Sequence, residues 1–223
     1  MSNQTLDINK LEIAVFDWDN TLALSKECLI CSINEILPNF GYRDWDSVKN
    51  LRDRNLSFRD NFPRIFGEKS QEAYKQYKEI YKTKIEKLIT APDKAPEVIE
   101  FLRKQNKKIM IVSNKDRELL ELELPLLYDL SNFDNIVCGH EAPKDKPNPE
   151  QLIYAVKKHI SHINTENVWM IGDSPMDSDC AINAGAKAIR IGKPIWGYDD
   201  NKNGNDIVFI KDFTDFCKML GEQ

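Results

Sequence analysis

Beyond Pro92 the chain alternates amphipathic helices with short apolar strands, and this alternation restricts the fold more than any other feature. The predicted helices cover 97–105, 117–126, a segment beginning at Asn148 (N-cap) and Pro149, and 178–184. The strands that follow them are Lys108–Val112, 136–138, 168–171, 188–191 and Ile207–Ile210. Alternating helices and apolar strands form a parallel sheet with helices on both faces. We therefore predict an α/β fold.

The first part of the chain has a different pattern of apolar residues. One apolar strand, 11–16, is followed from about 26 to 90 by helical periodicity without a convincing strand. An amphipathic helix is predicted over 70–89, with a tyrosine stripe typical of core packing. At 223 residues the chain is long enough for a domain with an insertion. We predict a catalytic core formed by residues 1–24 and 91–223, with a small helical domain, 25–90, inserted after the first strand.

Polar residues follow four of the predicted strands. In open α/β sheets, ligands bind outside the carboxyl ends of the strands, so these side chains are expected to converge. In chain order, they are Asp17, Asp19, Thr21, Ser113, Asn114, Lys146, Asp173 and Asp177.

These residue types suit phosphoryl transfer. One carboxylate can attack phosphorus and carry it as an aspartyl-phosphate, and a second can act as general acid and base. Oxygen ligands from several strands suit Mg²⁺. A hydroxyl and a lysine can hold the remaining phosphoryl oxygens as charge develops.

Four motifs occur in order along the chain: DWDNT (17–21), VSNK (112–115), DKPNP (145–149) and GDSPMDSDCAINAG (172–185). Together they resemble the four motifs of the haloacid dehalogenase-like phosphohydrolases, and the resemblance runs from about Leu11 to 195–198. It implies a Rossmann-like core with a helical cap of the phosphoglycolate phosphatase and β-phosphoglucomutase type.

The resemblance also implies roles for the acidic residues. Asp17 corresponds to the nucleophile and a Mg²⁺ ligand, and Asp19 to the general acid/base, with its backbone carbonyl on the metal. Asp173 corresponds to a direct metal ligand. Asp177 is expected nearby without binding the ion directly, although it could instead be the N-cap of the helix that follows.

The remaining motif residues are expected around the phosphoryl group. The resemblance implies that Ser113 and Lys146 bind it, that Thr21 orients the first motif and that Asn114 borders the substrate. The plainer alternatives are a helix cap for Ser113 and a surface position for Lys146.

Some positions depart from the family or carry no assigned role. Asn20 stands where relatives often have glycine, but asparagine accepts positive φ, so the loop is expected to keep its shape. Leu24 replaces an aspartate common in relatives, while Trp18 and His140 receive no role. In the arginine-rich segment 52–64, Arg59 is the candidate for contacting the substrate from the cap, with pairing to neighbouring aspartates as the alternative.

The resulting hypothesis is a Mg²⁺-dependent phosphatase acting on a small phosphorylated metabolite. A phosphoglucomutase-like enzyme needs the same core residues and is the first alternative, and a non-catalytic binding module is the second. A dehalogenase is disfavoured because the resemblance places an acid at Asp19, which those relatives lack. A phosphonatase would need a Schiff-base lysine in the cap, and none of the lysines there is distinguished.

Composition and charge limit the binding partners and the cellular compartment that we expect. A net charge of −5 gives the whole chain no electrostatic signature for nucleic acid or anionic membranes. No apolar run approaches the length of a membrane span, and the N-terminus lacks the apolar stretch of a signal peptide. Five cysteines with a single CxxC pair (Cys28 and Cys31), together with only three histidines, argue against a zinc site or a disulfide framework. A cytoplasmic monomer or homodimer is expected.

Overall fold

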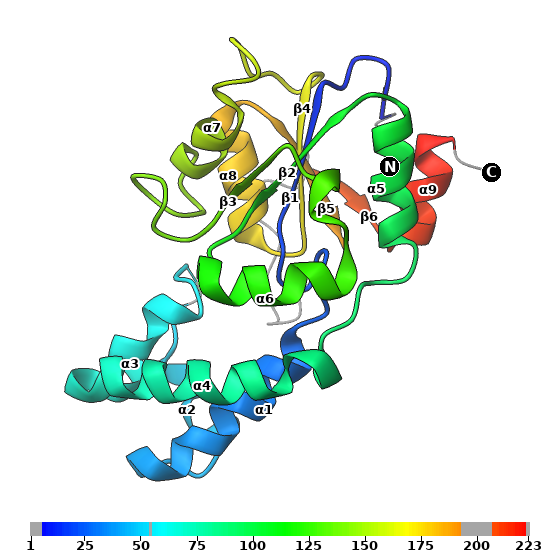
Figure 1. Cartoon of the computed structure of the whole chain (residues 1–223). Coiled ribbons are helices and arrows are strands. Elements are labelled where there is room, and N and C mark those ends of the chain that lie inside the picture. Colours follow the sequence, from blue (N-terminus) through cyan, green and yellow to red (C-terminus); the bar gives the residue numbers. More distant parts are fainter. Residues whose placement is uncertain (1–5, 54, 193–206, 222–223) are drawn as a thin grey trace.

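The protein is built on a six-stranded parallel sheet with the strand order β3-β2-β1-β4-β5-β6 (Figure 1). The computed structural model describes residues 6–53, 55–192 and 207–221. The strands are β1 (Ile13–Phe16), β2 (Lys108–Val112), β3 (Asn135–Val137), β4 (Val168–Gly172), β5 (Lys187–Ile191) and β6 (Ile207–Ile210). The predicted α/β fold is confirmed, and so are the predicted strands, to within about two residues at their ends.

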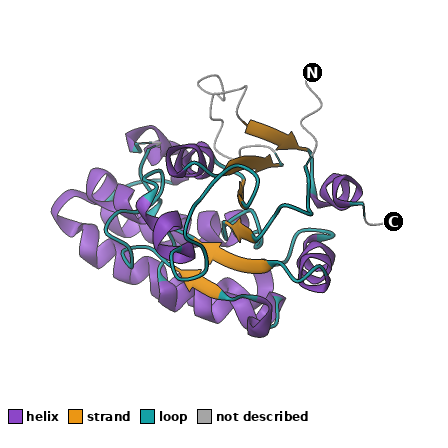
Figure 2. Ribbon diagram, turned by 90° about the horizontal axis from the view of Figure 1, so that it is seen from above, coloured by secondary structure: helices purple, strands orange, loops and turns teal. Residues whose placement is uncertain are grey.

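Helices cover both faces of this sheet (Figure 2). Successive side chains of a strand point to opposite faces. Ala14 and Phe16 of β1 therefore pack with one set of helices, and Ile13 and Val15 with the other. The first set comprises α5 (Ala95–Lys104), α6 (Arg117–Leu127) and α9 (Phe213–Leu220), and the second α7 (Glu150–Val156) and α8 (Pro175–Ala184).

Three of these helices begin at residues other than those predicted, and α5 starts at Ala95 rather than 97. Helix α8 starts at Pro175 rather than 178, because Ser174 and Asp177 form a capping box that fixes the first turn. Asp177 is thus the third residue of α8, and the alternative that it is the N-cap was wrong. Helix α7 starts one residue after the predicted first position, with Pro149 as N-cap and the Asn148 side chain accepting a hydrogen bond from Glu150 N.

The described part of the segment between β1 and α5 contains helices joined by turns and no strand. It contains α1 (Lys26–Ile36), α2 (Trp45–Val48), α3 (Phe62–Phe66), α4 (Ser70–Leu88) and short 3₁₀ turns. These helices lie beyond the carboxyl ends of the strands, and α6 lies between the sheet and α4 (Figure 1). The chain enters and leaves the insertion side by side, since Leu24 N donates to Thr90 O at 2.8 Å. The domain boundaries stay a prediction.

The tyrosine stripe of α4 packs into the insertion, as expected. Tyr77 and Tyr81 are 3% and 1% exposed, and the Tyr77 ring contacts Phe58 and Phe62. In the described part of the chain, every helix is too short or too polar to span a bilayer. Residues 195–198, where the resemblance ends, lie outside the described residues.

Candidate active site

Three neighbouring strands at the centre of the sheet end at the same level and deliver the first polar side chains. Phe16, the last residue of β1, is in register with Ile111 of β2 and Ile171 of β4. Beyond the strand ends lie Asp17, Ser113 and Asp173, all buried. They line a cavity of about 120 Å³, which the insertion closes from the opposite side with residues that include Phe58, Arg59, Tyr74 and Tyr77.

Lys146 donates hydrogen bonds to two of the acids that line this cavity. Its ammonium lies 2.6 Å from Asp17 Oδ1, 2.7 Å from Asp177 Oδ1 and 2.7 Å from the Val112 carbonyl. At 5% exposure it is no surface lysine, so the plainer alternative for Lys146 was wrong. On the other side of Asp17, Thr21 Oγ1 donates to Asp17 Oδ2 at 3.4 Å, and the role of Thr21 in orienting the first motif stays a prediction.

The carboxylates of Asp17, Asp173 and Asp177 form a buried cluster that fits a divalent cation. One oxygen of each lies within 4.8 Å of the others. Burial raises the pKa of Asp17, Lys146 opposes the shift, and Asp177 adds to it. Burial followed by repulsion from Asp17 and Asp177 raises the pKa of Asp173 well above its ordinary value. Lys146 pairs with Asp17 and Asp177, Arg190 only partly opposes the charge of Asp173, and such a concentration of buried negative charge is what a cation offsets.

Asp173 and Asp177 differ in the hydrogen bonds that their carboxylates accept. Asp177 Oδ1 accepts from Lys146, and its Oδ2 accepts from Ser174 N and Oγ, so both oxygens are engaged. Within the described part of the chain, no group donates a hydrogen bond to the Asp173 carboxylate. This pattern favours Asp173 as the direct ligand and Asp177 as a neighbour. Gly172 is required here, because a Cβ at this position would meet the Asp177 carboxylate.

The raised pKa of Asp17 predicts how the stability of the metal-free protein depends on pH. The pKa lies near 7 in the folded protein against an ordinary value of 3.8, so between about pH 4 and 7 the folded state holds protons that the unfolded state has released. The free energy of unfolding in EDTA should therefore fall as pH rises through this window, by about 1 kcal/mol per pH unit for each such proton.

Urea unfolding of the wild type and of Asp17→Asn at several pH values in EDTA measures this effect. The wild type is expected to lose more stability between pH 5 and 7.5 than the variant does, and Mg²⁺ should reverse the loss at pH 7.5. Identical pH profiles for the two proteins would contradict the predicted titration of Asp17.

Asp19 lies outside the carboxylate cluster. Its Oδ1 accepts hydrogen bonds from Ser25 Oγ at 2.5 Å and from Lys115 Nζ at 2.8 Å. Asn20, which follows, has φ of 61°, so the expectation that asparagine would accept the conformation of this turn is confirmed.

Three residues near Asp19 received no role from the sequence. Lys115 follows Asn114, Glu123 is fully buried on α6, and Trp18 Nε1 donates to Glu123 Oε2 at 2.6 Å. Lys115 is part of a quoted motif but was not singled out. A signal for Glu123 was present, since it lies on the apolar face of α6 beside Leu120 and Leu124.

Ser113 and Asn114, at the end of β2, differ in the polar groups they leave available. The Ser113 hydroxyl lines the cavity and accepts a hydrogen bond from Lys115 N. Helix α6 is capped by Asp116, so the alternative that Ser113 is the cap was wrong. The Asn114 amide accepts from Lys146 N at 3.0 Å and donates to Lys146 O at 2.8 Å. Asn114 thus borders the cavity mainly by holding the loop that carries Lys146.

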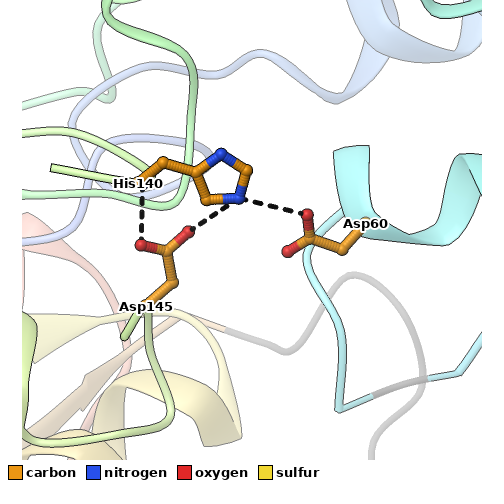
Figure 3. Close-up of side chains that lie close together, drawn as sticks. All are labelled: Asp60, His140 and Asp145. Atoms are coloured by element: carbon orange, nitrogen blue, oxygen red, sulfur yellow. Dashed lines mark hydrogen bonds and ion pairs between the residues drawn. The ribbon is translucent and has the colours of Figure 1, made fainter. Parts of the chain in front are cut away.

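Arg59 and His140 lie where the insertion meets the core. The Arg59 guanidinium lines the cavity and pairs with Asp60, Asp116 and Asp145, so the predicted cap arginine links its own segment to two core loops. His140 is exposed, and Figure 3 shows its ring directed towards Asp60 and Asp145, with Nε2 3.6 Å from Asp60 Oδ1. These three side chains also have the spacing of metal ligands, but Arg59 already bonds both carboxylates.

Comparison with known proteins places this site in a family. The model of the haloacid dehalogenase-like hydrolases matches residues 14–191. The pyrophosphatase PpaX of Bacillus mycoides is 28% identical over 182 residues, which are 82% of this chain and 84% of PpaX. Two solved structures share the fold.

A phosphoglycolate phosphatase predicted in Haemophilus somnus aligns with a TM-score of 0.77 at 21% identity, over 95% of this chain and 98% of that one. CbbY of Rhodobacter sphaeroides in complex with phosphate aligns with a TM-score of 0.75 at 17% identity, over 91% and 95%. At these identities the two structures support the α/β core with a helical insertion.

Proposed function

Because the chain belongs to the haloacid dehalogenase-like hydrolase family, we propose that it is a Mg²⁺-dependent phosphatase with an aspartyl-phosphate intermediate on Asp17. Its substrate is a small phosphorylated metabolite. Family membership makes the chain a hydrolase, as expected from the sequence, and the name of its relative PpaX supports a phosphatase.

One observation carries the proposal beyond the family. Asp17 lies among two further buried carboxylates and a buried lysine, and Asp19 lies apart with its own donors. The first environment suits a nucleophile whose charge a metal offsets, and the second suits a group that exchanges protons. A binding module would need neither the excess of buried acid nor the separation of the two roles.

The chemical steps follow from these positions. An oxygen of Asp17 attacks phosphorus and forms the acyl phosphate, while the bond from phosphorus to the leaving oxygen breaks. Asp19 gives its proton to that leaving oxygen and then, as a carboxylate, takes a proton from the water that attacks the acyl phosphate. The attack releases inorganic phosphate and restores Asp17.

The other side chains stabilise the charge that develops on the phosphoryl group. Ser113 and Lys146 both line the cavity, and their hydroxyl and ammonium would donate to the phosphoryl oxygens. Mg²⁺ held by Asp17, Asp173 and the Asp19 carbonyl would supply further positive charge there and orient the phosphoryl group.

The size of the cavity supports a small substrate. A volume of about 120 Å³ is well below the roughly 300–1,000 Å³ of drug-sized pockets. A phosphorylated two- or three-carbon compound or pyrophosphate fits this limit better than a nucleotide. Pyrophosphate belongs among the candidates because PpaX is named a pyrophosphatase.

Phosphate release from a panel of such compounds tests the proposal. The panel contains pyrophosphate, phosphoglycolate, sugar phosphates and nucleotides, each assayed with Mg²⁺ and with EDTA. We expect Mg²⁺-dependent release by the wild type and a decrease on the order of 10²–10⁴-fold in Asp19→Asn.

Two other results would contradict the proposal. Release that persists in EDTA, or equally in Asp19→Asn, would remove the proposed mechanism. Transfer of the phosphoryl group between sugar phosphates without release would favour the phosphoglucomutase-like alternative.

A further inference from the structure

A buried polar network joins Asp19 to α6 of the core and to α4 of the insertion, and Lys115 lies at its centre. The Lys115 ammonium is 2.8 Å from Asp19 Oδ1, 2.8 Å from Glu123 Oε1 and 2.9 Å from Tyr81 Oη. Its side chain is 7% exposed. Two of these contacts are hydrogen bonds, to Asp19 and Tyr81, and the contact with Glu123 is an ion pair.

The network also includes a hydrogen bond from the first motif. The second oxygen of Glu123, Oε2, accepts the Trp18 indole N–H at 2.6 Å, and Trp18 is the residue between Asp17 and Asp19. Trp18 and Glu123 are both fully buried. The Glu123–Lys115 pair therefore holds two parts of the first motif. Glu123 fixes the backbone beside Asp19 through Trp18, and Lys115 fixes the Asp19 carboxylate.

The two carboxylate oxygens of Asp19 differ in their hydrogen bonds. Ser25 Oγ and Lys115 Nζ both donate to Oδ1, and the Asp19 side chain is 31% exposed, so the carboxylate keeps access to the cavity. We propose that Lys115 is a positioning residue that holds Asp19 by Oδ1, so that Oδ2 exchanges the proton with the leaving group and with water. This inference rests on the proposed function, in which Asp19 is the general acid and base.

The insertion takes part through Tyr81. The Lys115 ammonium lies 4.7 Å from the centre of the Tyr81 ring as well as donating to its hydroxyl. Tyr81 belongs to α4, so the environment of Lys115 is complete only when α4 is packed against the core. The position of Asp19 is thereby coupled to the insertion.

Two variants remove the contact between Lys115 and Asp19. Lys115→Met alone leaves Glu123 buried without its cation and is expected to be destabilised. The double variant Lys115→Met/Glu123→Gln removes both charges and keeps an acceptor for the Trp18 indole, so it keeps the protein folded if the single variant does not. Lys82→Met is the matched control, because Lys82 pairs α4 with Glu118 of α6 and does not contact Asp19.

The measurement is kcat/KM for two substrates that differ in their need for a general acid. Nitrophenolate leaves p-nitrophenyl phosphate without a proton, whereas a poorer leaving group needs one from Asp19. For the non-aryl substrate that the wild type cleaves fastest, we expect both Lys115 variants to lose about 100-fold. For p-nitrophenyl phosphate we expect a loss of less than about threefold, because this leaving group depends little on the acid. Lys82→Met should match the wild type on both substrates.

Asp19→Asn, assayed in parallel, separates this inference from the proposed function. If Asp19→Asn shows the selective loss and the Lys115 variants show none, or lose activity equally on both substrates, the positioning role is overturned and the proposed function stands. A raised KM with unchanged kcat on both substrates would make Lys115 a substrate contact and would also overturn it. If Asp19→Asn keeps full activity, both proposals fail.

Discussion

Asp17→Asn is expected to abolish turnover while leaving the protein folded. The amide cannot form the acyl phosphate, and loss of a nucleophile typically lowers kcat on the order of 10⁵-fold or more. The fold should tolerate the change because an amide oxygen can still accept the hydrogen bond from Lys146, which is 2.6 Å from Asp17 Oδ1. Removing one of three clustered acids also relieves repulsion in the metal-free protein.

Single-turnover phosphate release and thermal unfolding in EDTA measure the two halves of this prediction. The melting temperature of the variant should equal or exceed that of the wild type. Asp7→Asn, at an exposed position away from the site, is the matched control and should change neither quantity. An Asp17→Asn protein with full activity would show that another group attacks phosphorus, and a large loss of stability would mean that the charge of Asp17 holds the fold together.

The sheet and the family were predictable because local patterns determine them. Each strand is a short apolar run between helices, and parallel strands bring the residues at their carboxyl ends together wherever they lie in the sequence. Asp17, Ser113 and Asp173 therefore meet as expected, and the predicted fold and family are confirmed.

The start of α8 was also encoded locally, although its signal was overlooked. The Ser-x-x-Asp spacing of Ser174 and Asp177 is that of a capping box, and Pro175 suits the first helical position. The same capping contact holds Asp177 against Lys146, so a rule for helix ends also places a site residue.

The polar network around Asp19 was not predictable from local patterns. Trp18 and Glu123 are 105 positions apart and meet only because α6 packs across the end of the sheet. The sequence alone places Glu123 on the apolar face of a helix and does not show which cation pairs with it. Its role can be inferred only when the fold brings Lys115 and Trp18 to it. Arg59 is similar, because two of its three carboxylates lie in core loops far along the chain.

Lys146→Met is expected to give a large loss of stability. Lys146 pairs with two of the three buried acids, Asp17 and Asp177, and breaking a buried ion pair by removing one partner costs about 3–5 kcal/mol. Urea unfolding in EDTA should show a decrease of this size. Activity should fall on the order of 10²–10³-fold even with Mg²⁺, because a donor to the phosphoryl oxygens is lost.

Mg²⁺ should restore part of the stability of Lys146→Met, and by more than it stabilises the wild type, because the variant has lost the ammonium that pairs with Asp17 and Asp177. Lys144→Met is the matched control. Its side chain is 66% exposed and lies 3.9 Å from Glu150, so its effect should stay within about 0.5 kcal/mol. Equal stability of the two variants in EDTA would mean that Lys146 does not compensate the acids in solution. Equal gains from Mg²⁺ would mean that the cation binds elsewhere.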